Sequence, residues 1–243
     1  MTSLAVTLRG LHVPGSPLVL ANAWDAASAS MVEEAGYHAV ASSSAAVADT
    51  EGWPDNNVMP ADVAIAAVAR VVRGTSLPVT ADIEGGYGLP AFELVERLLA
   101  AGAVGCNIED TDHSQVRTLV DRDTHVRRIE EVRAAAGDAL VVNARVDAIV
   151  RGGTLEEAIE RGKAYLAAGA DCVYPIFLGD PGDPGDVATF VEAVGGPVNI
   201  LFRPGAPSLA ELASLGVARV SIGSGWYRKV QAAMTDSLET FFG

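Results

Sequence analysis

Lysine and cysteine are scarce in this sequence of 243 residues. Of the 17 basic residues only Lys163 and Lys229 are lysines, and the pattern around both predicts helices. Schiff-base catalysis requires a desolvated lysine facing the site from a strand, so this chemistry is not expected. The two cysteines, Cys106 and Cys172, are too few for a disulfide framework, which favours a reduced, cytoplasmic setting. Both lie in apolar segments and are expected to be inert core residues.

Basic charge and long apolar runs are also lacking. The 17 Lys and Arg residues stand against 31 Asp and Glu residues, for a formal net charge of −14. A protein that binds a phosphate backbone needs a basic face to displace counterions, so nucleic acid is not an expected partner. No run approaches the ~18 to 20 apolar residues of a membrane span, and the first ten residues lack the apolar core of a signal peptide. We therefore expect no membrane partner either.

Short apolar runs alternate with amphipathic stretches along the whole chain. The runs are mostly rich in Val and Ile and show no clean polar alternation, which is typical of strands buried on both faces of a parallel sheet. The predicted strands are 17–22, 38–42, 77–82, 103–109, 139–145, 171–176, 197–201 and 218–223. The predicted helices are 25–34, 60–72, 91–101, 124–136, 154–168, 184–194, 208–215 and 225–242.

Eight strands alternating with eight helices indicate an α/β fold, a (β/α)8 TIM barrel. A doubly wound open sheet is the alternative, because periodicity does not show whether a sheet closes. No linker, charge run or low-complexity tract divides the chain, so we expect a single domain over residues 1–243.

Polar residues gather where the predicted strands end, which is where barrels of this kind place their chemistry. Asp82 and Glu84 alternate, so both side chains are expected on one face of the strand end. Several carboxylates at one barrel mouth would repel unless a cation held them, and oxygen ligands suit Mg2+ or Mn2+. Each acid taken alone is better explained as a helix cap or a solvated loop charge, whereas Asp82, Glu84 and Glu109 taken together favour a cation site. The histidines show no metal-ligand spacing, which disfavours a zinc site.

The segment 222–228, IGSGWYR, follows the last predicted strand. Its glycines are compatible with a phosphate-binding loop, as in the last loops of many barrels. They are equally compatible with a tight turn between strand and helix. Trp24, just after the first strand, is expected to pack rather than to cover a pocket.

An ordered set of motifs resembles the isocitrate lyase/phosphoenolpyruvate mutase superfamily. The motifs are LANAWDAASASMVEEAGYHAVASSSA, GWPD, TADIEGGYG, GCNIED, VVNARVDA, EEAIERGKAYLAAGADCVYP and PVNI. The resemblance implies a (β/α)8 barrel of the phosphoenolpyruvate-binding type that uses Mg2+. It also implies the making or breaking of C–C or P–C bonds next to a 2-oxo acid, through an enolate.

The resemblance also implies roles for individual residues. Asp82 resembles the acid that contacts Mg2+ directly. Arg145 resembles the arginine that pairs with substrate oxygens, and Asn199 resembles a polar residue lining the same pocket. The acids that resemble those holding the waters of the metal are Glu84, Glu109 and Asp55, and the segment that resembles the one gripping the substrate carboxylate or phosphonate is Ser43, Ser44 and Ala45. The catalytic set is therefore expected to be Arg145, Ser43 and Glu109.

The chain departs from the superfamily in the loop after NIED. The lyase branch carries Lys-Lys/Arg-Cys-Gly-His there and the mutase branch a lysine and an asparagine, whereas this chain reads TDHSQVRTLVDRD. Isocitrate or methylisocitrate cleavage and the phosphoenolpyruvate mutase reaction are therefore disfavoured. His113 and Ser114 are either replacements for the missing loop acid or exposed loop residues.

These inferences predict a Mg2+-dependent C–C bond lyase or hydrolase of a small 2-oxo acid or dicarboxylate, acting like an oxaloacetate decarboxylase through a pyruvate-type enolate. Mn2+ is an alternative metal. The alternative reaction is P–C bond chemistry, that of a phosphonomutase or phosphonopyruvate hydrolase similar to carboxyvinyl-carboxyphosphonate phosphorylmutase. A third alternative is a non-catalytic binder of a metal and a dicarboxylate. We expect a homo-oligomer, a tetramer or dimer, in which the C-terminal helix is exchanged or merely packed between subunits.

Overall fold

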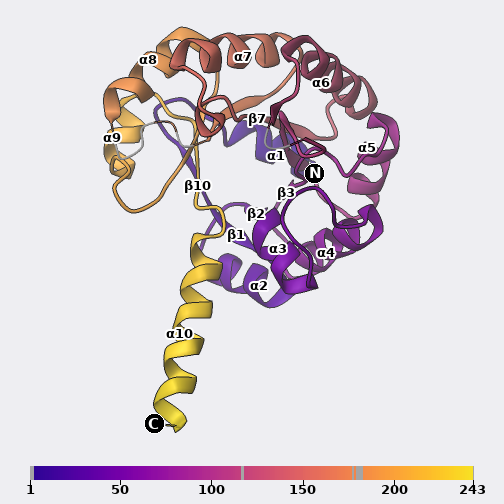
Figure 1. Ribbon diagram of the computed structural model, residues 1–243, viewed down its shortest axis with the longest axis vertical. Helices are drawn as coiled ribbons and strands as arrows, with labels where there is room; N and C mark the ends of the chain where they lie inside the picture. Colours follow the sequence, from indigo (N-terminus) through magenta and orange to yellow (C-terminus); the bar gives the residue numbers. More distant parts are fainter. Residues whose placement is uncertain (1–2, 116–117, 177, 179–182, 243) are drawn as a thin grey trace.

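Eight parallel strands form a ring with helices around its outside in the computed structural model, which describes residues 3–115, 118–176, 178 and 183–242 (Figure 1). The strands are β1 Leu18–Ala23, β2 Val40–Ser42, β3 Val79–Asp82, β4 Gly105–Glu109, β7 Val141–Val146, β8 Cys172–Pro175, β9 Asn199–Leu201 and β10 Arg219–Ser221. Their order is β8-β7-β4-β3-β2-β1-β10-β9. A parallel bridge between Val173 and Val198 joins the two ends, with Val173 N donating to Pro197 O at 3.0 Å. This pairing brings the sheet round into a nearly closed barrel and excludes the open doubly wound sheet.

The helices outside the barrel follow the predicted ones with shifts at their ends. They are α2 Ala26–Glu34, α4 Ala61–Arg73, α5 Ala91–Ala100, α6 Arg122–Ala136, α7 Leu155–Ala167, α8 Pro184–Val194, α9 Leu209–Ser214 and α10 Gly225–Phe242. Asp25 and Ser208 begin their helices with capping boxes. Helix α6 starts earlier than predicted, because the side chain of Asp121 caps it by accepting a hydrogen bond from Thr124 N at 3.0 Å.

A short helix that was not predicted, α1 Leu4–Gly10, covers the amino end of the barrel. Leu8 is fully buried in a cluster with strand residues such as Leu18 and Leu20. A Cβ at Gly105 would lie 2.8 Å from a methyl carbon of Leu8, so glycine is needed at this approach. The Arg9 side chain donates to Asp171 at 2.7 Å, just before β8. Because α1 occupies this end, access to the barrel interior is from the carboxyl ends of the strands.

Three segments expected to be loops also have regular structure. Residues after β2 form the helix α3 Ser44–Glu51, with Ser43 as its N-cap. After β4 the chain forms a small hairpin from β5 Thr111–Asp112 and β6 Thr118–Leu119. A 3-10 turn, η1 Ile149–Arg151, follows β7. All of these elements lie at the carboxyl ends of the strands, so they shape the site.

The apolar core lies mainly between the strands and the outer helices. Its two largest clusters involve helix residues such as Phe190 and Leu94 packed against strand residues such as Val173 and Ile108. Cys106 and Cys172 are fully buried and unpaired, and burial raises the pKa of each thiol to about 12. The prediction that both cysteines are inert core residues agrees with this environment.

Helix α10 extends away from the barrel as a separate arm (Figure 1). Tyr227 anchors its first turn, because its hydroxyl donates to Asp49 and its ring packs edge-on against Trp24 with centroids 5.1 Å apart. Trp24 therefore packs, as expected, and does not cover the cavity described below. Among the described residues, no helix is both long and apolar enough to cross a membrane.

Candidate active site

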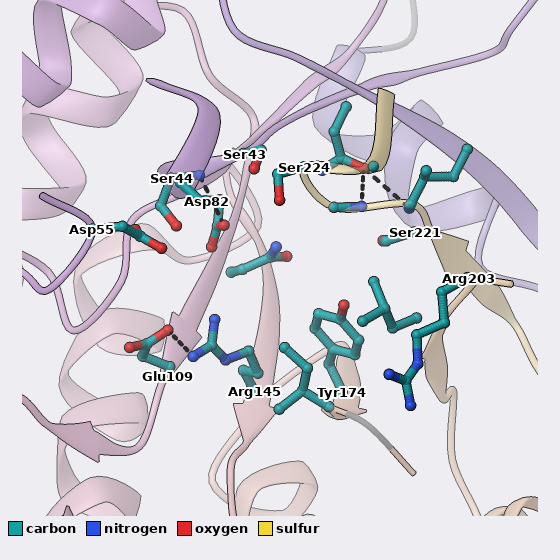
Figure 2. A pocket seen from close by; sticks show the side chains of 18 of the residues that line it. Ser43, Ser44, Asp55, Asp82, Glu109, Arg145, Tyr174, Arg203, Ser221 and Ser224 are labelled. Carbon is teal, nitrogen blue, oxygen red and sulfur yellow. Dashed lines mark hydrogen bonds and ion pairs between the residues drawn. The ribbon is translucent and has the colours of Figure 1, made fainter. Parts of the chain in front are cut away.

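A cavity of about 720 Å³ opens at the carboxyl ends of the strands (Figure 2). Eight of the nine predicted site residues line it: Ser43, Ser44, Ala45, Asp55, Asp82, Glu84, Glu109 and Arg145. The ninth, Asn199, is fully buried behind the wall, where its Nδ2 donates to Ser221 Oγ at 3.1 Å. Ser221 does line the cavity, so any effect of Asn199 on a ligand would pass through this hydroxyl.

Asp82 ends β3 and is held by the neighbouring strand and helix. Its Oδ2 accepts a hydrogen bond from Ser44 N at 3.0 Å, and its own N–H donates to Ser42 Oγ at 2.8 Å. Ser44 is the first residue of α3, so the amino end of this helix faces Asp82. The partial positive charge at a helix amino end favours a carboxylate there. The helix that was not predicted therefore positions the acid expected to contact the metal.

The prediction that Glu84 lies on the same strand face as Asp82 is wrong. Strand β3 ends at Asp82, and Glu84 lies in the following turn with φ of +50°, rather than on the same strand face. Its Oε2 accepts from Asn57 N, and in the described part of the chain its buried Oε1 has no hydrogen-bond partner. Burial, followed by the charge of Asp55, raises the pKa of Glu84 to about 8. Glu84 is thus a carboxyl group poorly solvated by its surroundings and facing the cavity.

Backbone strain is concentrated at this turn. The described non-glycine residues with positive φ are Asn57, Glu84 and Tyr87, at +55°, +50° and +54°. They contact one another, because Asn57 also accepts from Tyr87 N at 2.9 Å. Such conformations cost about 1 to 3 kcal/mol each and cluster at functional sites. The loop that carries Asp55 and the turn that carries Glu84 are therefore locked together.

Glu109 and Arg145 form an ion pair across β4 and β7, which are neighbours in the sheet. The second oxygen of Glu109 contacts His113 Nε2 from the β5 side. Arg145 also donates to Asp147, from Nε to Oδ1 at 2.7 Å and from Nη2 to Oδ2 at 2.8 Å. Although burial opposes its charge, Asp147 and then Glu109 raise the pKa of Arg145 well above its usual value. The guanidinium is therefore permanently charged and fixed in orientation.

Two buried acids behind Arg145 were not among the predicted site residues: Asp147, which holds Arg145, and Asp110, which holds Asp147. Asp147 is fully buried and also accepts from Thr111 Oγ1, while its N–H donates to Asp110 Oδ1 at 2.8 Å. Asp110 in turn accepts from the Tyr165 hydroxyl at 2.6 Å. Burial and then the charge of Asp147 raise the pKa of Asp110 to about 6. The signal was available in the motifs NIED and NARVDA, whose final acids are these two residues.

The acids at this side of the cavity influence one another. Asp55 lies at the exposed rim, yet partial loss of water and then the charge of Asp82 raise its pKa. Repulsion by Asp55, Glu109 and Asp82 also contributes to the raised pKa of Glu84. Within the described ranges, however, no three His, Cys, Asp or Glu side chains form a preformed metal cage. All four cavity acids supply oxygen, so the set fits a hard cation bound largely through its own waters.

Two other expectations about the loops are resolved by contacts. The N–H groups of Ile222 and Gly223 donate to Asn22 Oδ1 at 3.1 and 2.9 Å, so these two amides hold the tight turn between β10 and α10. His113 lines the cavity, whereas Ser114 is exposed and bonds to Asp112. Of the two loop residues considered as replacements for a loop acid, only His113 faces the site.

The opposite wall of the cavity was not predicted. Arg203, which follows β9, lies across the cavity from Asp55 and Asp82 (Figure 2). Arg228 and Lys229, from the first turns of α10, line the cavity too. Lys229 lies in a helix as expected, yet its ammonium lies 4.5 Å from the centre of the Trp226 ring at the cavity. Arg228 ends the segment IGSGWYR and Lys229 follows it directly, but neither residue was predicted to line the site.

Comparison with known proteins adds to this geometry. A family model described as phosphoenolpyruvate phosphomutase matches residues 8–242. The chain belongs to the isocitrate lyase/phosphoenolpyruvate mutase superfamily. The superfamily predicted from the motifs is thereby confirmed, together with the barrel and the expectation of an enzyme of this superfamily.

The relatives of this superfamily member differ in the reactions that their names describe. It is 36% identical to a phosphonomutase candidate from Burkholderia cenocepacia J2315, with a TM-score of 0.89 and 98% of both chains covered. It is 32% identical to the 2-methylisocitrate lyase of Escherichia coli K12 over 186 residues, 68% of this chain and 62% of that enzyme. A phosphonopyruvate hydrolase solved with oxalate and Mg2+ is 26% identical, with a TM-score of 0.82 and 97% and 88% of the two chains covered.

Proposed function

We propose that this protein is a Mg2+-dependent lyase of a small 2-oxo acid, acting through a pyruvate-type enolate, with oxaloacetate decarboxylation as its leading reaction. The observation that carries the proposal is the meeting of four carboxylates with Arg145 and the amino end of α3 in one cavity. Asp82 would hold the metal directly, and Asp55, Glu84 and Glu109 would hold its waters. Mn2+ would suit the same oxygen donors. Bound metal supplies a Lewis acid that lowers the energy of the enolate charge.

The residues of the chain then divide the remaining work. The Ser43 hydroxyl and the first amides of α3 would bind the substrate carboxylate, as helix amino ends commonly do. Arg145 is held by Asp147 and pairs with Glu109 in the absence of substrate. Its guanidinium would leave Glu109 and donate to the substrate oxygens instead. Donors fixed before the reaction stabilise the developing negative charge without reorganisation. In decarboxylation the electron pair of the breaking C–C bond enters the 2-oxo group to form the enolate, CO2 leaves, and a proton is later added to the carbon that lost CO2.

The missing loop acid supports decarboxylation over aldol-type cleavage. CO2 leaves without needing a proton, whereas an aldol product must be protonated or deprotonated by a group in the loop. His113 is the described residue of the hairpin that lines the cavity. The second candidate function is P–C bond cleavage or rearrangement, favoured by the similarity to the Burkholderia protein and to phosphonopyruvate hydrolase. A binder without turnover is the third, and retention of all four acids and Arg145 argues against it.

Oxalate, a mimic of the pyruvate enolate, tests the proposal without requiring turnover. We expect calorimetry to show that Mg2+ strengthens oxalate binding by at least tenfold. Turnover of oxaloacetate and of phosphonopyruvate then separates the two reactions, and a binder would process neither. Asp82→Ala should abolish both the effect of Mg2+ and turnover, while Asp62→Ala, at an exposed acid of α4 outside the cavity, should change neither. Equal oxalate affinity with and without Mg2+ would overturn the proposal.

We also propose that the protein is a homo-oligomer held together through α10. Val230, Met234 and Leu238 lie on this helix at a spacing of four residues and are at least half exposed. Residues four apart share one helix face, so they form an apolar stripe along the projecting arm. A second copy of the chain would bury this stripe. Light scattering on the intact protein should show a dimer or tetramer, and Met234→Glu should dissociate it; a monomer in the unaltered protein would overturn this proposal.

A further inference from the structure

The barrel interior beneath the cavity holds a fully buried arginine. Arg219 lies on β10, and in the part of the chain that the structure describes no carboxylate forms an ion pair with it. Its Nη1 is also buried, with no hydrogen-bond partner among the described residues. Burial lowers the pKa of Arg219, but a guanidinium keeps its proton in proteins. A positive charge that no acid neutralises by direct contact therefore lies below the site, although taking such a charge out of water is costly.

Two neutral side chains lie between Arg219 and the cavity. Arg219 Nη2 donates to Asn107 Oδ1 at 3.0 Å, and Arg219 Nε donates to Ser221 Oγ at 3.4 Å. Nε and Nη2 form one edge of the guanidinium, so Asn107 and Ser221 lie next to each other along that edge. Both residues line the cavity, and Figure 2 labels Ser221 there. Asn107 and Ser221 are here called the cavity floor.

The cavity floor adjoins the acids of the proposed metal site. Asn107 is paired with Asp82 in the parallel register of β3 and β4. It also precedes Glu109 by two residues on β4, so the two side chains share one strand face and Asn107 lies deeper in the barrel. A substrate bound among these acids therefore has the cavity floor beneath it.

Hydrogen bonds behind the cavity floor occupy its acceptors and leave its donors for a ligand. Asn107 Oδ1 accepts from Arg219 and also from Asn143 Nδ2 at 2.8 Å, which takes both lone pairs. Ser221 Oγ accepts from Arg219 and from Asn199 Nδ2 at 3.1 Å. Because arginine can only donate, the amide of Asn107 cannot turn round without losing its bond to Arg219. Within the described ranges, neither Asn107 Nδ2 nor the Ser221 hydroxyl donates to a protein atom.

We propose that Asn107 and Ser221 are oxyanion donors, giving hydrogen bonds to the substrate oxygen that becomes negative in the enolate, and that Arg219 positions both of them. This inference rests on the proposed function, because formation of the enolate is what makes that oxygen negative. Donors fixed before the reaction stabilise a developing charge without reorganisation. The charge of Arg219 also polarises both donors from below, since linked hydrogen bonds strengthen one another in a low dielectric.

Oxalate and pyruvate compare the charged and the neutral form of this oxygen on the intact protein with Mg2+. Both ligands have one carboxylate, but oxalate carries a second carboxylate where pyruvate has a neutral 2-oxo group and a methyl group. Donors that stabilise the enolate favour oxalate over pyruvate, because they act more strongly on the charged form. Calorimetry of the unaltered protein measures this preference, and each variant is then compared with it.

Asn107→Asp exchanges the free donor for an acceptor without changing the size of the side chain. One carboxylate oxygen would still accept from Arg219 and Asn143, while the other would face the cavity and repel an anion. We expect oxalate affinity to fall by about tenfold or more, whereas the melting temperature should stay equal or rise because Arg219 gains an ionic partner. A purely structural role would lower stability and affinity together. Asn56→Asp, at an exposed asparagine that also lines the cavity, adds the same charge but keeps the cavity floor, and should weaken oxalate much less.

Arg219→Met removes the buried charge but keeps an unbranched side chain. Replacing a buried ion by an apolar group is often neutral or stabilising, so the variant should fold. We expect the preference for oxalate over pyruvate to fall by about tenfold, and Arg219→Lys, which keeps the charge, to retain part of it. Ser221→Ala removes one donor and should also lower the preference. If Arg219→Met does not fold, Asn107→Asp decides by itself.

Failure of this inference and failure of the proposed function give different results. Unchanged oxalate affinity in Asn107→Asp, an equal loss in Asn56→Asp, or equal weakening of oxalate and pyruvate in Arg219→Met would each overturn the oxyanion role. Mg2+-dependent oxalate binding in the unaltered protein would still uphold the proposed function in those cases. Equal oxalate affinity with and without Mg2+ in the unaltered protein would overturn the proposed function and this inference with it.

Discussion

The two walls of the cavity are built in opposite ways. On the acidic side, Glu84 and Glu109 are almost completely buried, and their surroundings include the strained turn and the buried Asp147. On the basic side, Arg228 and Lys229 are exposed and belong to an arm that projects from the barrel. The difference suggests that the two sides of the cavity have different functions. Groups that act on the reacting atoms need to be fixed before the reaction, whereas exposed charged side chains can adjust their position.

After Asp82→Ala, the largest effect is expected from Asp147→Asn. The amide keeps the size of the side chain but loses the charge-assisted fork that holds Arg145. We expect kcat/KM to fall about 100-fold, equivalent to about 2.7 kcal/mol of transition-state stabilisation. Steady-state kinetics on oxaloacetate, with kcat and KM determined separately, measure this effect. Asp186→Asn, at an exposed acid of α8, is the control, and equal kinetics in both variants would contradict a positioning role for Asp147.

Glu84→Gln is expected to change how stability depends on pH. The pKa of Glu84 is about 8 in the folded protein, above the ordinary value of 4.5, so the folded state binds the proton more tightly. The contribution of protonated Glu84 to the free energy of unfolding is therefore present at low pH and is lost as the pH rises through about 8. Without metal, the melting temperature of the unaltered protein should fall between about pH 5 and pH 8.5.

In Glu84→Gln this fall should be shallower, because no charge forms at position 84. Adding Mg2+ at high pH should restore stability in the unaltered protein more than in the variant, since the cation offsets the repulsion from Asp55 and its neighbours. Thermal unfolding followed by circular dichroism measures both curves. The same slope in both proteins would show that Glu84 is not the group whose proton is held.

A smaller effect is expected from Ser43→Ala on the acidic side. The hydroxyl caps α3 by accepting from Ala46 N at 3.5 Å, so its loss should cost about 1 kcal/mol of unfolding free energy or less. Because α3 presents the amide that holds Asp82, oxalate affinity should fall as well. Denaturant unfolding and calorimetry measure the two effects, with Ser30→Ala in α2 as the control. Unchanged stability together with unchanged oxalate affinity would contradict this role.

The smallest effect on stability is expected on the basic side of the cavity, at Lys229. Lys229→Ala removes an exposed ammonium whose recorded contact is with the face of Trp226. The unfolding free energy should change by no more than about 0.5 kcal/mol. Denaturant unfolding against the unaltered protein measures it. A loss of several kcal/mol would mean that this wall is as tightly built as the acidic one, and the contrast between the two would not hold.

The sequence predicted the barrel because strand and helix patterns depend on neighbouring residues. Runs such as 139–145 are apolar enough to be recognised without their partners. Helix α1 was missed because it has seven residues and its stability comes from the packing of Leu8 beneath the barrel. Helix α3 was missed because its alanines, serines and acids show no amphipathic pattern. The shift of Glu84 off its strand depends on a positive φ that no local pattern indicates.

By itself, the sequence determined the eightfold alternation, the acids at the strand ends, and the motifs that identify the superfamily. These are properties of short segments, which local hydrophobicity and residue order express directly. Tertiary structure alone decided which isolated residues share the cavity. The ends of the sheet meet through Val173 and Val198, and this closure sets the loop after β9 and the start of α10 opposite Asp82. Closure of a barrel is a long-range event, so no local pattern in the sequence places Arg203, Arg228 and Lys229 in one cavity with Asp82.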